Sequence, residues 1–247
     1  MKIYAVGIGP GDRNYMAPYA EKIISECEVI IGYTAYLKLI PDLVTGKEVI
    51  DTGMKGETAR CELAFQETKL GKKVAVVSSG DAGIYGMASL LMEMTENETD
   101  IEIEVVPGIT ACVAAASLLG APLANDFAVV SLSDLLTSWQ TIEKRLEAAG
   151  LGDFVVCLYN PGSKTRKNSL RQACEILLKH KNPQTCCGYV RNALRNNRQY
   201  QLCSLQELSD ISVDMLTTAI VGNSDTKQIH NKLVTTRGYR LQRKKLS

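Results

Sequence analysis

The feature that most constrains this fold is an apolar run that ends in a glycine-rich loop. Residues 73–79 read KVAVVSS, and residues 78–88 continue as SSGDAGIYGMA. A strand without polar alternation is typical of a parallel sheet that helices cover on both faces. The carboxyl ends of such strands are where open α/β sheets hold small ligands. Gly80, Gly83 and Gly86 permit a sharp turn and a close approach of ligand to backbone, so the sequence predicts a loop that wraps a small polar molecule.

Strand and helix patterns alternate along the rest of the chain. Before residue 122 the strand patterns cover 2–8, 28–33, 73–79 and 101–106, and the helix patterns cover 17–27, 57–70 and 109–119. Gly120 and Pro122 interrupt this series. A second series has strand patterns over 128–136, 154–159, 185–192, 197–204 and 217–224, with helices that begin at Ser138, with Trp139 toward the core, and near Leu170. We therefore predict two α/β domains with mixed sheets, residues 1–122 and 123–247.

Composition excludes several classes of protein. The formal net charge of the 247 residues is +1, so no chain-wide field selects nucleic acid or an anionic membrane. No segment approaches the roughly 18 consecutive apolar residues of a membrane span, and the N-terminus lacks a signal-peptide layout. The eight cysteines form no C-x-x-C pair and the two histidines are far apart, so we expect no metal site. Buried structural thiols and the lack of a disulfide framework fit a reducing cytoplasm.

The loop GIGPGD, residues 7–12, is similar to a dinucleotide-binding loop but has a different glycine spacing. Its glycines fall at positions 7, 9 and 11, whereas the G-x-G-x-x-G fingerprint needs the third where Asp12 stands. Pro10 also removes an N–H group that a pyrophosphate would use. The chain has no P-loop, H-E-x-x-H or G-x-S-x-G motif and only two histidines. These absences favour a reaction that depends on positioning a reactive donor, of which methyl transfer from a sulfonium is an example.

Two further loops follow apolar strands. VVPGITA covers residues 105–111, and YNPGSKTR covers residues 159–166. The second carries Lys164 and Arg166 beside a glycine turn, and VRNALRNNR, residues 190–198, adds further arginines. Basic clusters on a chain of balanced charge point to a small polyanion rather than to a nucleic-acid surface.

Taken together and in this order, GIGPGD, SSGDAGIYGMA, VVPGITA and LYNPG resemble the tetrapyrrole (corrin/porphyrin) methyltransferase family. The resemblance covers roughly residues 1–241. Six stretches resemble the subgroup that methylates carbon 17 of precorrin-3B or cobalt-factor III: SSGDAGIYGMA, SLSDLLTSW, LYNPGSKTR, VRNA, AIVGNS and TTRGY. Ala82 departs from the commoner Gly-Asp-Pro form of the family.

The resemblance implies a tetrapyrrole methylase fold, with a ligand cleft between two α/β domains, and a homodimer. The cysteine usage implies that the protein is cytoplasmic. It implies that S-adenosyl-L-methionine is the methyl donor and is held largely by backbone groups. The positions that match the family's donor site are Pro10, Gly80, Asp81, Ala82, Ile84, Tyr85, Thr110, Ala111, Leu158, Tyr159, Ala219, Ile220 and Val221.

The resemblance also implies the reaction, which is methylation of carbon 17 with contraction of the macrocycle. Contraction needs proton transfer, for which the candidates are Asp12, Asp126 and Asp134, although aspartate is also typical of turns and caps. The candidates for binding the tetrapyrrole are Ser131, Ser133, Lys164, Arg166, Arg191 and Arg195. The sequence leaves open whether the substrate carries cobalt. Three alternatives also stay open: another tetrapyrrole methyltransferase, a nucleotide-dependent oxidoreductase and a non-catalytic tetrapyrrole carrier.

Overall fold

The computed structural model describes residues 1–54, 56–97, 100–163 and 166–239, and the chain divides into two compact units between Ala111 and Cys112. We call these the first unit and the second unit. The division precedes the predicted boundary at residue 122 by one helix, because that helix packs within the second unit. A Cβ atom on Gly188 would lie 2.8 Å from Cδ2 of Leu119, near the end of this helix, and Gly120–Ala121 pairs with a C-terminal strand.

The first unit is built on a wholly parallel five-stranded sheet. Its strand order is β3-β2-β4-β1-β5. The strands are β1 (Lys2–Gly7), β2 (Val29–Tyr33), β3 (Glu48–Thr52), β4 (Val74–Ser78) and β5 (Glu102–Val106). The prediction of a mixed sheet is wrong for this unit, since all four strand pairs are parallel. Parallel neighbours need crossover connections, and helical segments supply them here.

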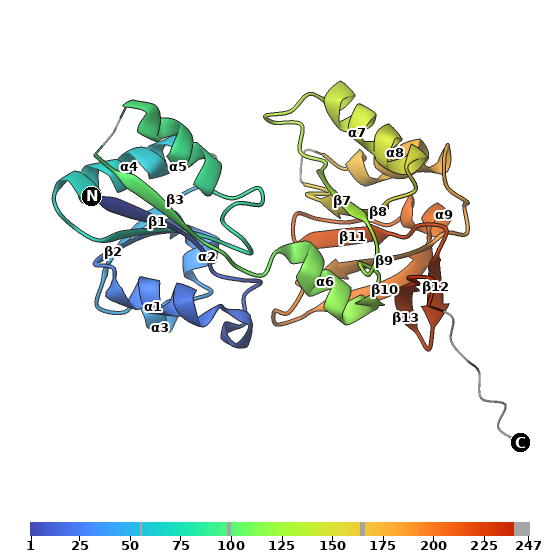
Figure 1. Cartoon of the computed structure of the whole chain (residues 1–247), viewed down its shortest axis with the longest axis horizontal. Helices are drawn as coiled ribbons and strands as arrows, with labels where there is room; N and C mark the ends of the chain where they lie inside the picture. The colour runs from blue at the N-terminus through green and yellow to red at the C-terminus, as the bar shows by residue number, and fades with distance from the viewer. Residues whose placement is uncertain (55, 98–99, 164–165, 240–247) are drawn as a thin grey trace, which may run out of the picture. The chain divides into compact units, whose positions relative to one another are not determined.

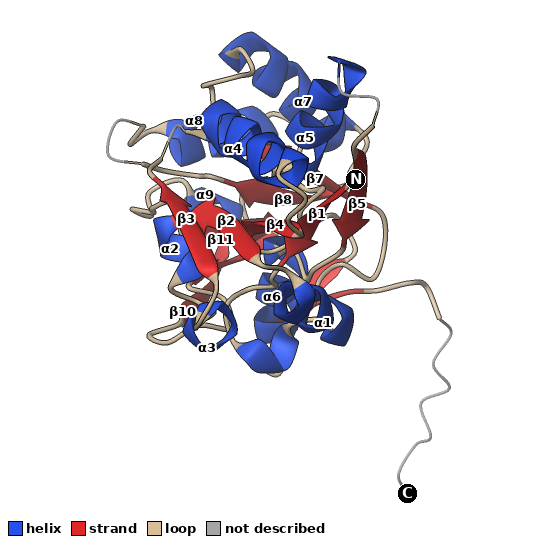
Figure 2. Ribbon diagram, turned by 90° about the vertical axis from the view of Figure 1, so that its left-hand side faces the viewer, coloured by secondary structure: helices blue, strands red, loops and turns tan. Residues whose placement is uncertain are grey.

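Helices cover both faces of this sheet (Figures 1 and 2). One face carries α4 (Glu57–Lys69) and α5 (Ala88–Met94), and the other carries α1 (Pro18–Glu26), α2 (Thr34–Leu37) and α3 (Pro41–Val44). Two apolar layers result, and every residue of β4 is buried, as its uninterrupted apolar run predicted. The chain leaves β1 toward β2 on one side of the sheet and leaves β4 toward β5 on the other. The loops after β1 and β4 therefore flank the point where the strand order reverses, which is where open α/β sheets bind ligands.

The second unit contains a mixed sheet, as predicted, in the order β10-β9-β11-β8-β7. Only β7 and β8 pair in parallel, and the other pairs are antiparallel. The strands are β7 (Phe127–Ser131), β8 (Val155–Tyr159), β9 (Cys186–Arg191), β10 (Gln199–Ser204) and β11 (Thr217–Val221). One face packs against α7 (Trp139–Leu151), α8 (Ser169–Leu178) and α9 (Leu205–Leu208), and Trp139 contacts this core as predicted.

Smaller elements complete both units. In the second unit α6 (Ala111–Leu119) leads into a three-stranded sheet of β12 (Thr226–Ile229), β13 (Lys232–Thr235) and β6 (Gly120–Ala121). Two short 3₁₀ turns, η1 (Arg13–Tyr15) and η2 (Thr95–Asn97), belong to the first unit.

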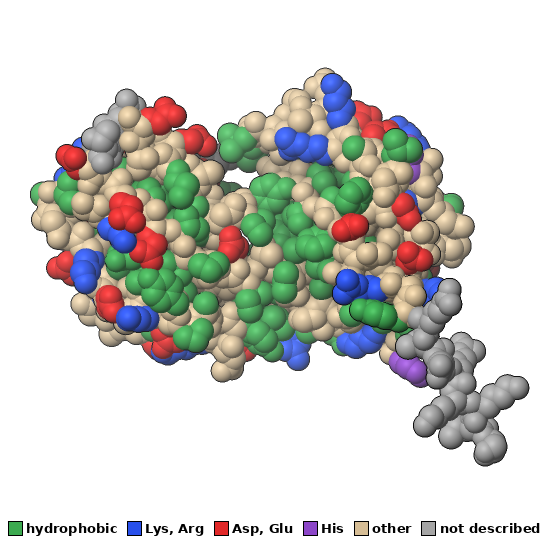
Figure 3. Space-filling view, viewed as in Figure 1, with side chains coloured by type: hydrophobic (Ala, Val, Ile, Leu, Met, Phe, Trp, Pro, Cys, Tyr) green, Lys and Arg blue, Asp and Glu red, His purple; other side chains and the backbone are tan. Residues whose placement is uncertain are grey.

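On the face that Figure 3 draws, charged side chains are dispersed rather than gathered by sign. On the face drawn in Figure 3, Lys and Arg side chains lie among Asp and Glu side chains in both units. Within the described ranges, no helix has the length and apolar character needed to cross a membrane, and no three or more His, Cys, Asp or Glu side chains group as metal ligands would. All eight cysteines are free, and Cys157 and Cys174 have no exposed surface, which confirms that they are core thiols.

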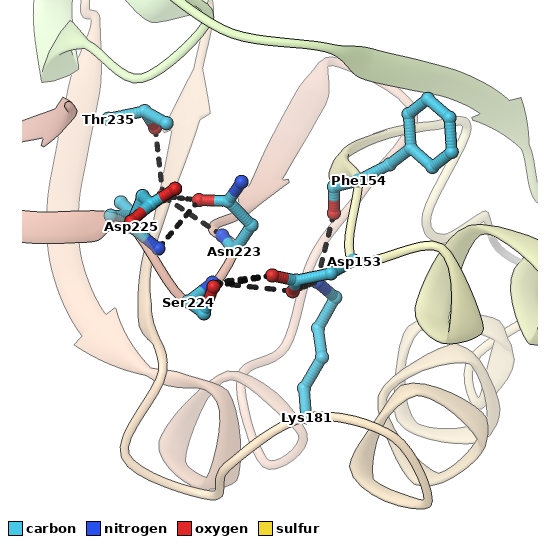
Figure 4. Close-up of polar contacts among 8 residues, drawn as sticks. Asp153, Phe154, Lys181, Asn223, Ser224, Asp225 and Thr235 are labelled. Carbon is cyan, nitrogen blue, oxygen red and sulfur yellow. Dashed lines mark hydrogen bonds and ion pairs between the residues drawn. The ribbon is translucent and has the colours of Figure 1, made fainter. Parts of the chain in front are cut away.

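An ion pair between a buried lysine and a half-exposed aspartate ties three segments of the second unit together (Figure 4). The Lys181 ammonium donates to Oδ1 of Asp153 at 3.0 Å and to the Phe154 carbonyl at 2.9 Å. Ser224, from the AIVGNS stretch, donates its hydroxyl to Oδ2 of Asp153 at 2.6 Å. The Lys181 side chain is only 2% exposed, so its charge depends on the Asp153 carboxylate.

We expect the free energy of unfolding to fall as the pH drops below about 4, the usual pKa of an aspartate. Partial burial raises the pKa of Asp153, but the hydrogen bonds from Ser224 and Lys181 outweigh burial and hold this pKa below its usual value. The stabilisation is therefore complete above the unfolded-state pKa and is lost as the pH falls through the lower, folded-state pKa. Chemical denaturation of the wild type and of Asp153→Asn, at pH 7 and at pH 3, measures this stabilisation. The difference in free energy of unfolding between the two proteins should be smaller at pH 3 than at pH 7. An equal difference at both pH values would contradict the stabilising role of the Asp153 carboxylate.

Candidate active site at the carboxyl edge of the parallel sheet

The loop after β4, residues 79–87, is joined to the loop after β1. We call residues 79–87 the glycine loop. Gly9 donates its N–H to the Gly80 carbonyl at 3.0 Å, and Gly80 donates to the Gly9 carbonyl at 2.7 Å. Both residues have positive φ, 72° and 75°, a conformation that glycine adopts without steric cost. This pair of hydrogen bonds joins the two loops at the point where the strand order reverses.

Asp81 joins the glycine loop to the loop after β5. Its Oδ2 accepts the Gly108 N–H at 2.9 Å, and its Oδ1 accepts the N–H groups of Gly83 at 2.8 Å and Ile84 at 3.2 Å. One carboxylate thus satisfies three backbone donors from two loops. Asp81 therefore shapes the loop edge, and its direct contact with a donor stays a prediction.

Backbone atoms of the three loops pack against one another with no room for a side chain. A Cβ atom on Gly108 would lie 2.2 Å from the Gly80 carbonyl oxygen and 2.7 Å from that of Gly7. A Cβ atom on Gly86 would lie 2.4 Å from the Ala82 carbonyl oxygen. The carboxyl edge of the sheet is consequently a closely packed, backbone-rich surface.

The tip of the glycine loop presents apolar side chains to solvent. Ile84 is 41% exposed and Tyr85 is 56% exposed. Tyr85 has a φ of 54°, which is strained for a bulky residue and is typical of ligand-binding sites. Ala82 is fully buried in the apolar core, so its side chain faces away from this surface.

The remaining predicted donor residues of the first unit lie beside the same loop. Thr110 is 8% exposed, and a Cβ atom on Gly80 would lie 3.6 Å from Thr110 Cα and 3.8 Å from the Ala111 amide nitrogen. Pro10 follows Gly9 directly and is buried. The structure thus brings Pro10, Gly80, Thr110 and Ala111 together at one edge.

The predicted donor residues of the second unit lie on two paired strands. Leu158 and Tyr159 end β8, and Ala219 of β11 pairs with Leu158. Ile220 and Val221 continue along β11 opposite Cys157 and Val156. The Tyr159 hydroxyl accepts the backbone N–H of Cys112 at 2.7 Å. The donor contacts predicted for these residues stay predictions.

The three candidate acids are divided between the two units, with Asp12 in the first and Asp126 and Asp134 in the second. Asp12 caps η1, where Oδ1 accepts the Asn14 N–H at 2.9 Å. Asp126 precedes β7 and Asp134 follows it, so these two lie beyond opposite ends of a strand of 5 residues. Asp134 is near Arg166, with Oδ1 3.6 Å from Nε. The structure therefore favours the cap interpretation for Asp12, and it does not pair Asp126 with Asp134.

Three of the six candidate substrate residues, Ser131, Ser133 and Arg166, lie where β7 and β8 end. Oγ of Ser131 accepts from Nδ2 of Asn160 at 3.0 Å and from the Ser133 N–H at 3.3 Å. Nη1 of Arg166 donates to the Leu132 carbonyl at 3.0 Å, and its side chain is 14% exposed. Arg166 thereby holds the two loops together.

The other basic candidates differ in their surroundings. Arg191, at the end of β9, is 49% exposed and pairs with Asp214, with Nη2 2.6 Å from Oδ2. Arg195 donates its backbone N–H to the Asn192 carbonyl at 3.0 Å in the following turn. Lys164 lies outside the described residues.

Comparison with known proteins establishes the family. The profile described as Tetrapyrrole (Corrin/Porphyrin) Methylases matches residues 2–209. The chain belongs to the tetrapyrrole methylase family.

Individual tetrapyrrole methylases match nearly the whole chain. It is 44% identical over 237 residues to the probable cobalt-factor III C(17)-methyltransferase of Salmonella typhimurium, covering 96% of this chain and 98% of that protein. It is also 44% identical to the cobalt-factor III methyltransferase of Priestia megaterium, of which it spans 45%. The crystal structure of the methyltransferase CobJ matches with a TM-score of 0.87 and 33% identity, covering 95% of this chain and 98% of that one.

The first unit of this tetrapyrrole methylase fits the methyl donor of its family. An adenosine needs a flat apolar contact and backbone hydrogen-bond partners, and the exposed Tyr85 lies beside just such a backbone-rich edge. The glycine loop is uncharged apart from Asp81, whose carboxylate accepts backbone N–H groups. Pro10, Gly80, Ile84, Tyr85 and Thr110 would hold the donor, which supplies an electrophilic methyl group when bound.

Sequence reasoning missed two features of these edges. Leu135 is 63% exposed and Leu136 101% exposed in the loop after β7, and consecutive leucines in a loop were the available signal. Arg60 of α4 is 3% exposed at the carboxyl edge of the first sheet. Its place within a helical pattern gave no sign that it is buried.

Proposed function

We propose that this protein transfers the methyl group of S-adenosyl-L-methionine to carbon 17 of a precorrin-3B or cobalt-factor III type tetrapyrrole, with contraction of the ring, in cobalamin biosynthesis. The observation that carries the proposal is the end-to-end 44% identity with the Salmonella relative named for that reaction. The joined loops at the carboxyl edge of the first sheet supply the physical basis for donor binding.

Positioning is the chain's main contribution to this chemistry. A closely packed loop edge fixes the donor without reorganisation when the reaction occurs. The backbone groups around Gly80 and Thr110 suit the polar part of the donor, and Tyr85 suits its base.

The carboxyl edge of the second sheet suits a tetrapyrrole. The macrocycle is flat and apolar, with carboxylates around its rim. Leu135 and Leu136 offer exposed apolar surface after β7, and Arg191 offers a half-exposed guanidinium at the end of β9. Arginine binds carboxylates through a two-pronged geometry. We further propose that the enzyme is a cytoplasmic homodimer.

The test offers cobalt-factor III, precorrin-3B and uroporphyrinogen III separately, each with the donor, and reads the visible spectrum and the product mass. The proposal expects one added methyl on one of the first two substrates only. Methylation of uroporphyrinogen III alone would assign a sister reaction, and tight substrate binding without transfer would assign a carrier. Calorimetry with NAD(P) should show no binding, because the third fingerprint glycine is replaced by Asp12.

A further inference from the structure

Arg60 is a buried cation at the edge that carries the glycine loop. It lies in the first turn of α4 and is 3% exposed. Its Nε donates to Oγ1 of Thr52 at 2.7 Å, its Nη2 to the Gly53 carbonyl at 3.2 Å and its Nη1 to Sδ of Met87 at 3.4 Å. One guanidinium therefore joins the end of β3 to the end of the glycine loop.

Among the residues that the structure describes, the Arg60 guanidinium has no carboxylate as a hydrogen-bond acceptor. Its three acceptors are a hydroxyl, a carbonyl and a thioether, and no ion pair within 4.0 Å involves this residue in the described part of the chain. Buried arginines are ordinarily paired, because desolvation of an unpaired charge lowers stability. The start of α4 adds the positive end of the helix dipole, and Gly56 supplies no side-chain cap. An apolar side chain of similar length would therefore suit the stability of this unit at least as well.

Through its hydrogen bond to Met87, Arg60 contacts the far end of the glycine loop. Met87 is the last residue of the glycine loop, and its N–H also donates to Oγ of Ser78 at 3.2 Å. The start of the loop is held by Gly80 and Asp81, so Arg60 and Ser78 fix its far end. The exposed Ile84 and Tyr85 lie between these anchors. The guanidinium presents five N–H donors in a fixed planar fork, which suits three acceptors that lie apart from one another.

We propose that Arg60 is a positioning residue for the methyl donor, and that it fixes the far end of the glycine loop through Met87. The inference rests on the proposed function. It assigns to a buried residue outside the predicted donor contacts a role in donor affinity rather than in stability.

The test compares Arg60→Met with the wild type by thermal unfolding and by calorimetry with S-adenosyl-L-methionine. We expect an unchanged or higher Tm and a donor Kd raised about tenfold, the scale of one lost charge-assisted hydrogen bond. In the methyl-transfer assay the donor KM should rise by a similar factor, with kcat changed less than about threefold. Arg171→Met, which removes an arginine that is 56% exposed, is the matched control and should change neither quantity.

Other outcomes decide against the proposal. A lower Tm with an unchanged donor Kd would make Arg60 a stability residue and overturn it. Arg60→Met could fail to fold, or could have both a lower Tm and a higher donor Kd. In either case Thr52→Val and Met87→Leu decide, because each removes one contact of Arg60 and keeps its charge. A raised donor Kd in either supports the proposal, and an unchanged Kd in both overturns it. If the wild type itself binds no donor, the proposed function fails instead.

Discussion

Replacing Gly108 with alanine is expected to destabilise the first unit by about 3 kcal/mol or more, the upper range for an overpacked site. The new Cβ atom would lie 2.2 Å from the Gly80 carbonyl oxygen and 2.7 Å from that of Gly7. Both neighbours are backbone atoms, so no side-chain rotation can relieve the overlap. The loops after β1, β4 and β5 would have to separate, and donor binding should be lost with them. Chemical denaturation of the variant measures the loss.

Gly53→Ala is the matched control for this experiment. A Cβ atom there meets nothing within 4 Å, so we expect a stability change below about 1 kcal/mol. If Gly108→Ala unfolds at the same denaturant concentration as the wild type, the three loops do not converge as described.

Asp81→Ala is expected to raise the donor Kd about 100-fold, which corresponds to losing roughly 3 kcal/mol. Hydrogen bonds to a charged acceptor contribute about 1.5–3 kcal/mol each, and this carboxylate accepts from Gly83, Ile84 and Gly108. Without it, the loops after β4 and β5 lose their side-chain connection, and the donor has to order them on binding. Calorimetry with S-adenosyl-L-methionine measures the change.

Two further variants sharpen the Asp81 experiment. Asp81→Asn keeps one acceptor oxygen and should give an intermediate donor Kd. Asp126→Ala removes an exposed aspartate of the second unit and should leave the Kd unchanged. Donor affinity that is the same in Asp81→Ala and the wild type would refute the role assigned to this carboxylate.

The sequence predicted those elements whose local residue pattern matches their burial in the fold. The uninterrupted apolar run of β4 and the glycines behind it identified the carboxyl edge and its loop. The strand pattern at 101–106 is confirmed as β5, which is an edge strand of its sheet. In these places local pattern and tertiary environment agree.

Other features depend on partners far away in the chain. The hairpin of β12 and β13 gave no alternating pattern, and its sheet requires β6, more than 100 residues earlier. The wholly parallel arrangement of the first sheet follows from crossover geometry, which strand patterns do not contain. Asp126 and Asp134 are close in sequence, yet one precedes β7 and the other follows it. The burial of Arg60 depends on Thr52 and Met87, which lie on either side of α4 in sequence.

The most direct test of the proposed function uses S-adenosyl-L-methionine with a ¹³C-labelled methyl group and cobalt-factor III as acceptor. Carbon NMR of the purified product locates the label on the macrocycle. The proposal predicts one labelled methyl on carbon 17 of a ring-contracted product. It predicts an initial rate of labelling about tenfold lower when Asp81→Ala replaces the wild type at a donor concentration ten times the wild-type Kd. A label on any other carbon, or no transfer to cobalt-factor III or to precorrin-3B, would contradict it.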